Sequence, residues 1–255
     1  MNGSLIVRHI YDVYWFIGCA VCGLLTGRLF VWLFNRLPAS WLCDYGEEPG
    51  PELEAPRLYR RPDALKFGLL FSAAFLLLYL QYGGKNLYFF TCCAAVVLLA
   101  VVAVSDAKYG VIPDQFTLML LAPGAAVAAR ELLGGGGIFF LKPYSPFAGA
   151  LLGGALYLLL GFLGKLFYRK ESIGMGDVKL FAVLGFFCGF PQVVFVFLLT
   201  IVLAGFHFIL LMLFKKLEKD SYLPLGPYIC LAFYLYLAFR WQLNYLVGWY
   251  AAMLL

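Results

Sequence analysis

The sequence predicts an all-α polytopic membrane protein with about eight transmembrane helices. Of its 255 residues, 64% are hydrophobic and only 13% are charged, whereas about one quarter of the residues in a soluble domain are charged. The apolar residues gather in long runs, and about twenty consecutive apolar residues are enough to cross a bilayer. The net charge of +5 is modest, so we attribute it to membrane orientation and expect no nucleic-acid partner.

Four helices are expected in the first half of the chain. The first apolar run is too long for the hydrophobic region of a cleavable signal peptide, so it is expected to remain as a span. The fourth opens at a proline, which is favoured in the first turn of a helix. These four helices are expected at Val13–Phe34, Phe67–Tyr82, Leu87–Ser105 and about Pro113–Leu133.

Four more helices are expected in the second half. The sixth is short and turns at Pro191 into the seventh. The tail, Trp241–Leu255, forms either a ninth short span or an interfacial helix, since tryptophan and tyrosine are enriched at membrane interfaces. The four helices are expected at Pro146–Tyr168, Asp177–Phe190, Val193–Phe214 and about Leu223–Phe239.

The distribution of lysine and arginine predicts the orientation. If the N-terminus lies outside, the expected inner loops hold most of these residues, including Arg36 and the basic run Arg57–Arg61, as the positive-inside rule requires. In this orientation Asp106 ends the third helix and Asp177 begins the sixth at the same cytoplasmic face. The two aspartates are 71 positions apart in the sequence, yet they are expected at the same membrane depth.

Asp106 and Asp177 are the strongest candidates for chemistry. An ionisable side chain in a membrane segment is costly, so its default interpretation is functional. Two neighbouring carboxylates cannot both ionise cheaply and therefore share a proton. In an aspartic protease, one carboxylate takes a proton from water while the other protonates or hydrogen-bonds the scissile carbonyl. This chemistry requires no metal and no cofactor.

Two glycines precede Asp177 in the segment Gly174-Met175-Gly176-Asp177. Because glycine lacks a Cβ, Gly174 and Gly176 could permit close backbone approach and unusual φ/ψ angles. Such a backbone could hold an extended peptide substrate by strand-like pairing. Alternatively, the glycines only end a loop, with Asp177 favourably placed at a helix N-terminus.

These motifs resemble those of a known family. Gly174–Leu180 resembles the Gly-x-Gly-Asp-x-Lys-Leu signature of the type IV prepilin peptidases, which are membrane aspartic proteases. Asp106 followed by Ile112-Pro113-Asp114 is similar to their first aspartate motif. The resemblance implies that Asp106 and Asp177 are the catalytic pair.

Two further elements carry the same resemblance. Leu225-Gly226-Pro227-Tyr228 resembles the family's late Phe-Gly-Pro-Tyr element, and Gly27 with Arg36-Leu37-Pro38 resembles the end of its first helix. The four elements occur in the family's order along the whole chain. We therefore expect Gly226 and Pro227 to support the site.

Asp114 and Lys179 are weighed separately. Asp114 follows Pro113, and a proline and an acid are ordinary residues in the first turn of a helix. We therefore favour a structural role for Pro113 and Asp114. Lys179 lies two residues after Asp177. It could extend to lipid headgroups, or it could hold Asp177 or a substrate carboxylate.

The chain departs from the bifunctional members of the family, which cleave the leader and then methylate the new N-terminus with S-adenosylmethionine. Their first cytoplasmic loop carries two CxxC pairs that can bind zinc, whereas the loop here has the single cysteine Cys43. One thiol cannot build a tetrathiolate site. Their first helix has serine and asparagine where this chain has Arg28 and Val31. We therefore expect a short-loop peptidase that binds no metal and uses S-adenosylmethionine only if methylation is retained.

The sequence thus predicts a multi-pass protease of the cytoplasmic membrane that removes the basic leader of prepilins or pseudopilins. Residues 1–66 are expected to form the first helix and a reduced cytoplasmic loop, and residues 67–255 the membrane-embedded peptidase domain. The substrate helix and membrane lipid are the expected partners. Acidic loop residues could attract the leader or form a solvated charge cluster, which we favour; they are Glu47, Glu48, Glu52 and Glu54.

Other functions remain as alternatives. A proton-coupled transporter could use the same aspartates, but it predicts repeated halves and acids near the bilayer midplane. A non-catalytic pilus or secretion assembly factor leaves both aspartates unexplained. A general intramembrane protease of the presenilin type does not account for the Asp-Val-Lys-Leu continuation or for Ile112-Pro113-Asp114.

Overall fold

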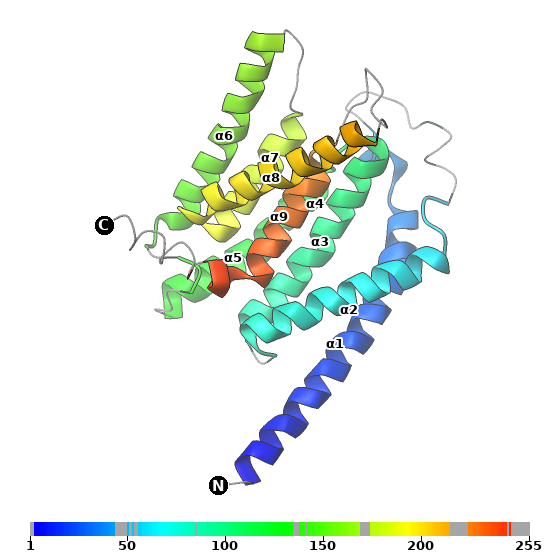
Figure 1. Ribbon diagram of the computed structural model, residues 1–255, viewed down its shortest axis with the longest axis vertical. Coiled ribbons are helices and arrows are strands. Elements are labelled where there is room, and N and C mark those ends of the chain that lie inside the picture. The colour runs from blue at the N-terminus through cyan, green and yellow to red at the C-terminus, as the bar shows by residue number, and fades with distance from the viewer. Residues whose placement is uncertain are drawn as a thin grey trace. The chain divides into compact units, whose positions relative to one another are not determined.

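A computed structural model describes residues 3–43, 50, 53, 56–84, 86–134, 138–140, 142–168, 174–214, 224–243 and 245. In these ranges all regular secondary structure is helical (Figure 1), which confirms the expected fold class. The four acidic loop residues and most of the tail after Trp241 lie outside the described residues. The predictions made for them therefore remain predictions.

Nine α-helices and one short 3-10 helix are described. Each of the expected apolar segments contains a helix, although several helices extend further into the flanking polar residues. In chain order they are α1 (Gly3–Arg36), η1 (Ala39–Trp41), α2 (Pro62–Tyr82), α3 (Leu87–Tyr109), α4 (Asp114–Met119), α5 (Leu121–Gly134), α6 (Ser145–Tyr168), α7 (Met175–Cys188), α8 (Gln192–Leu213) and α9 (Gly226–Ala238).

Fewer helices than the expected eight are long enough to cross a bilayer. Within the described ranges, six segments have the required length and hydropathy, and α9 is apolar but shorter. The α7 helix has only 14 residues and spans about 21 Å at 1.5 Å per residue, compared with about 30 Å of hydrocarbon. It ends at Cys188, the next residue Gly189 has a φ of +75°, and α8 starts at Gln192. The chain is thus a multi-pass membrane protein with six to seven candidate spans, and its orientation stays a prediction.

The helices divide into two compact units. Unit 1 comprises Met1–Ser40, Glu48–Val97 and Leu237–Leu255. Unit 2 comprises Trp41–Glu47 and Leu98–Tyr236, and it holds both candidate aspartates. The expected boundary at residue 66, between the first helix with its loop and the peptidase domain, stays a prediction.

Close packing of α1 on α2 organises unit 1. A Cβ added to Gly23 or Gly27 of α1 would overlap the backbone of α2 at Ser72 and Gly68. Small residues of this kind let membrane helices approach and gain van der Waals contact. The buried Arg57 donates hydrogen bonds to the carbonyl oxygens of Phe34 (3.1 Å), Leu37 (2.7 Å) and Leu53 (3.0 Å). It thereby satisfies carbonyls at the C-terminal end of α1, where a positive charge is favourable.

The α7 helix is central to unit 2. It packs against α4, α5, α6 and α8, and the Phe187 ring contacts the Phe233 ring of α9 with centroids 5.3 Å apart. Its closest neighbour is α6, because Gly149 and Gly153 bring the two backbones together. Packing on several sides fixes the position of α7, and its first turn carries Asp177.

Candidate active site

Asp106 lies in the last turn of α3 and is only 4% exposed. The helix ends at Tyr109, and the next residue, Gly110, has a φ of +67°, in the left-handed region that glycine adopts at low cost. The Gly110 N–H donates to the Asp106 carbonyl oxygen at 2.9 Å. The Ser105 hydroxyl then donates to the Val111 carbonyl oxygen at 2.8 Å, so the turn after α3 is fixed on both sides of Asp106.

Asp177 lies in the first turn of α7 and is also 4% exposed. Its backbone N–H donates to the Gly174 carbonyl oxygen at 3.1 Å. Gly174 is extended, with φ −72°, and Gly176 is not among the glycines with positive φ. The expected unusual φ/ψ angles are therefore wrong. Close approach is what Gly176 provides, because a Cβ there would lie 3.0 Å from the Ile112 Cβ.

The two buried aspartates lie within electrostatic range of each other. The buried Cys230 thiol of α9 lies within electrostatic range of both carboxylates. Two buried acids at this proximity favour a state in which one is ionised and the other is protonated. Such a pair can activate a water molecule and donate a proton at the same site.

Gly226 contacts Asp106 directly. The Gly226 N–H, at the start of α9, donates to Oδ2 of Asp106 at 2.7 Å in a buried hydrogen bond. Tyr228, two residues after Gly226 in α9, forms a hydrogen bond with His207 of α8. The sequence places Gly226 among the supporting residues, and the structure gives it a specific partner 120 positions away.

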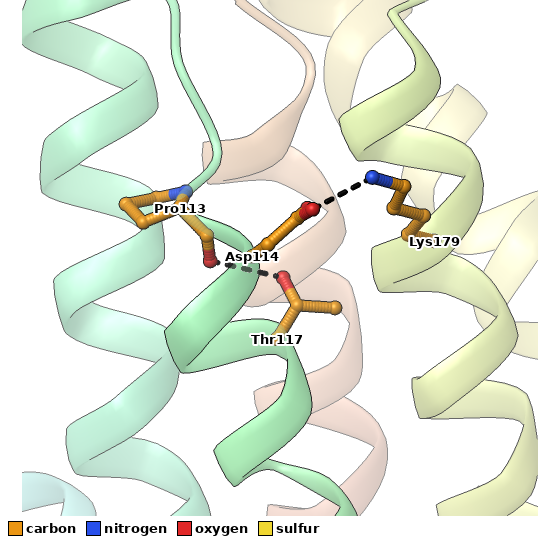
Figure 2. Close-up of polar contacts among 4 residues, drawn as sticks. All are labelled: Pro113, Asp114, Thr117 and Lys179. Carbon is orange, nitrogen blue, oxygen red and sulfur yellow. Dashed lines mark hydrogen bonds and ion pairs between the residues drawn. The ribbon is translucent and has the colours of Figure 1, made fainter. Parts of the chain in front are cut away.

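Asp114 and Lys179 form an ion pair between α4 and α7, with Lys179 Nζ 2.7 Å from Asp114 Oδ2 (Figure 2). Asp114 is the first residue of α4 and follows the N-cap residue Pro113, as expected for a helix start. The Pro113 carbonyl oxygen accepts a hydrogen bond from the Thr117 hydroxyl at 3.4 Å. Lys179 thus pairs with Asp114, and its expected roles toward Asp177, a substrate carboxylate or lipid stay predictions.

Comparison with known proteins identifies a family whose model covers the segment containing these aspartates. The model of the type IV leader peptidase family matches residues 93–209, a segment that contains Asp106, Asp114, Asp177 and Lys179. The chain is 33% identical over 139 residues to a prepilin leader peptidase/N-methyltransferase of Aeromonas hydrophila, covering 52% of this chain and 46% of that protein. It is 30% identical over 135 residues to leader peptidase HopD of Salmonella typhimurium, covering 52% of this chain and 81% of that protein.

The chain belongs to the type IV leader peptidase family. It spans about half the length of the first curated relatives that it matches. Leader peptidase HopD of Escherichia coli is matched over 82% of its length at 29% identity, covering 56% of this chain. A comparison with solved structures found no significant match.

The structure also places two buried residues within electrostatic range of the aspartates that sequence reasoning missed. Tyr157 of α6 is buried, lies within electrostatic range of Asp177 and interacts with Thr200 of α8. Its ring lies 4.5 Å from the ring of Phe181. Cys230 was missed as well. Both lie within apolar runs and carry no motif, so only the packing of helices could reveal them.

Candidate metal ligands are not grouped in the part of the chain that the structure describes. Among those residues, no three histidine, cysteine, aspartate or glutamate side chains are close enough to share an ion. All seven cysteines lie among the described residues, and none of them forms a disulfide there. The expectation that the site uses neither a metal nor a cofactor stays a prediction, tested below with a chelator.

Proposed function

We propose that this protein is an aspartic endopeptidase that removes the leader from prepilins or pilin-like proteins. Relatives at 33% and 30% identity are named prepilin leader peptidase/N-methyltransferase and leader peptidase. The observation that carries the proposal is the pairing of Asp106 and Asp177. Two helices from distant parts of the sequence bury these carboxylates within electrostatic range of each other, inside the segment that the family model matches.

The two carboxylates supply the groups that peptide hydrolysis needs. The ionised aspartate accepts a proton from water, and the resulting hydroxide adds to the scissile carbonyl carbon. The protonated aspartate gives its proton to the carbonyl oxygen, which forms a neutral tetrahedral intermediate. The C–N bond then breaks, and the leaving amine takes the proton that the first aspartate accepted from water. The second aspartate, now ionised, takes back a proton from one hydroxyl of the intermediate, so that the carboxyl product forms and the dyad returns to its starting state.

The proposed substrate is a membrane helix preceded by a short basic leader. The lysine and arginine pattern favours a site at the cytoplasmic face. Next to the dyad, Met175 in the first turn of α7 is 61% exposed, which supports an apolar approach to Asp177. The cytoplasmic membrane is the proposed location, and the substrate helix would lie along the membrane-embedded surface.

Leader removal without N-methylation is the activity we propose. The expected cytoplasmic loop between Asn35 and Leu65 has one cysteine, Cys43, so the four-thiolate zinc site of bifunctional members cannot form there. S-adenosylmethionine is then not required. Addition of a methyl group to the product would contradict this part of the proposal.

Incubation of the purified protein in detergent with a prepilin tests the proposal, with product masses measured in the presence and absence of S-adenosylmethionine. Cleavage should be lost in Asp106→Asn and in Asp177→Asn, because neither amide can exchange the required proton. Asp63→Asn is the matched control, since Asp63 lies in the first turn of α2, in unit 1. Retained cleavage in either dyad variant contradicts the assignment, and absence of cleavage by the unmodified protein favours the transporter or assembly-factor alternatives.

A further inference from the structure

The first turn of α9 has an unusual distribution of backbone donors. The first N–H groups of a helix have no partner within the helix. Here the N–H groups of Tyr228 and Ile229 both donate to the Leu225 carbonyl oxygen, at 3.0 and 3.1 Å. Pro227 has no N–H at all. The Gly226 N–H is therefore the donor left in this turn, and it points to Oδ2 of Asp106 at 2.7 Å.

Position 226 requires glycine because Asp106 leaves no room for a side chain there, and not because of its backbone conformation. Gly226 is not among the residues with positive φ. A Cβ at this position would lie 2.6 Å from Asp106 Oδ2 and 3.0 Å from both Cβ and Cγ of Asp106. Any larger residue would push the carboxylate away from the amide that binds it.

The hydrogen bond also selects a charge state. A backbone N–H that donates to a carboxylate stabilises the ionised form, and the N-terminus of α9 carries a partial positive charge that acts in the same direction. Asp177 also lies at a helix start, and Gly174 of its own loop is the backbone group that interacts with it. Asp106 differs because its donor comes from another helix and forms a short, buried bond.

We propose that Gly226 is a positioning residue, whose N–H orients Asp106 and holds it as the ionised, water-activating member of the dyad. The bond occupies Oδ2, so that Oδ1 is the oxygen available to accept the proton of water. Pro227 contributes by removing a competing donor from the same turn. Asp177 is then the member that carries the proton to the substrate carbonyl. This inference rests on the proposed peptidase function.

The kinetics of Gly226→Ala provide the test, with a prepilin as substrate. We expect kcat to fall by roughly tenfold or more, as for loss of a hydrogen bond to a charged group, while KM changes less than about twofold. The matched control is Gly205→Ala in α8, because a Cβ at Gly205 meets nothing within 4 Å. It should cleave at the rate of the unmodified protein.

The pH dependence of kcat tests the role of Asp106 separately. Among the described residues, Cys230 of α9 also interacts electrostatically with both aspartates, and Tyr157 of α6 interacts with Asp177. If Asp106 is the base, loss of its donor makes it harder to ionise, so the acid limb should move to higher pH in Gly226→Ala. Movement of the alkaline limb alone would show that Asp106 is instead the proton donor and would overturn the assignment.

A backbone ester at position 226 covers the case in which Gly226→Ala fails to fold. Joining residues 1–225 to a synthetic segment that begins with glycolic acid replaces the N–H by oxygen and adds no side chain. The same loss of kcat and the same shift of the acid limb are expected. An unchanged kcat with active unmodified protein overturns this inference alone, whereas an unmodified protein that cleaves no prepilin overturns the proposed function as well.

Discussion

The two neighbouring glycines Gly153 and Gly154 of α6 provide a sharp test of the packing that holds α7. Both are buried, but their surroundings differ. A Cβ at Gly153 would lie 2.7 Å from the backbone carbonyl oxygen of Phe181, and a backbone atom cannot rotate away. A Cβ at Gly154 would meet only the Ala182 Cβ at 3.5 Å, an ordinary contact. Alanine should therefore disturb α7 at position 153 and not at position 154.

The expected magnitude follows from comparing the two variants. Replacing glycine by alanine inside a helix stabilises it by about 0.5–1 kcal/mol, and this gain is common to Gly153→Ala and Gly154→Ala. Forcing an extra methyl into packed surroundings costs about 1–3 kcal/mol, and only Gly153→Ala incurs this cost. The free energy of unfolding should thus be about 1–3 kcal/mol lower in Gly153→Ala than in Gly154→Ala.

Thermal unfolding in detergent, followed with a thiol-reactive fluorophore, can measure this difference. Cys188 at the end of α7 is 0% exposed and Cys230 of α9 is 4% exposed, so both thiols report opening of unit 2. Gly153→Ala should react at a temperature several degrees lower, and its cleavage rate should also fall because Phe181 lies one turn from Asp177 on α7. Equal unfolding temperatures for the two variants would refute the close approach of α6 and α7.

Three further changes have defined outcomes. Lys179→Met removes an ion pair whose side chains are 45% and 27% exposed, so it should lower the free energy of unfolding by less than about 1 kcal/mol. Cleavage should remain measurable, and a complete loss of cleavage would assign Lys179 a role in catalysis. Arg57→Met leaves carbonyl oxygens at the end of α1 without their buried donor, so denaturant titration should show that the free energy of unfolding falls by about 2–3 kcal/mol. The control Arg61→Met, at an exposed position, should change it little. Incubation with EDTA should not slow prepilin cleavage, and a loss restored by added Zn²⁺ would contradict a metal-free dyad.

The sequence was sufficient to predict the membrane helices and to propose the aspartate pair. Long apolar runs identify spans directly, because the bilayer sets their length. Asp106 and Asp177 could be proposed as neighbours because an even number of expected crossings between them returns the chain to the same face. The sixth helix was expected to be short, at Asp177–Phe190, and α7 is short as well. The expected number of eight spans was nevertheless too high for the described residues, because neither α7 nor α9 has the length of a span.

The hydrogen bond between Gly226 and Asp106 could not be predicted from the sequence. Its two residues are 120 positions apart, and the bond depends on how α9 begins beside the end of α3. The motif Leu225-Gly226-Pro227-Tyr228 suggested a supporting role without naming a partner. Only the structure shows that the glycine leaves room for a carboxylate and that the proline removes a competing donor.

The partner of Lys179 was within reach of sequence reasoning, because helix geometry restricts it. Successive residues of an α-helix are rotated by about 100°, so Asp177 and Lys179 are about 200° apart and lie on opposite faces of α7. Asp177 interacts electrostatically with Asp106 and Cys230, while Lys179 reaches Asp114 of α4 (Figure 2). Contacts on two opposite faces limit rotation of α7 about its own axis. Lys179 and Leu180, which follow Asp177 closely in the sequence, thus help to hold the rotation of α7 that orients the Asp177 side chain. Leu180 contributes because it is fully buried in the core.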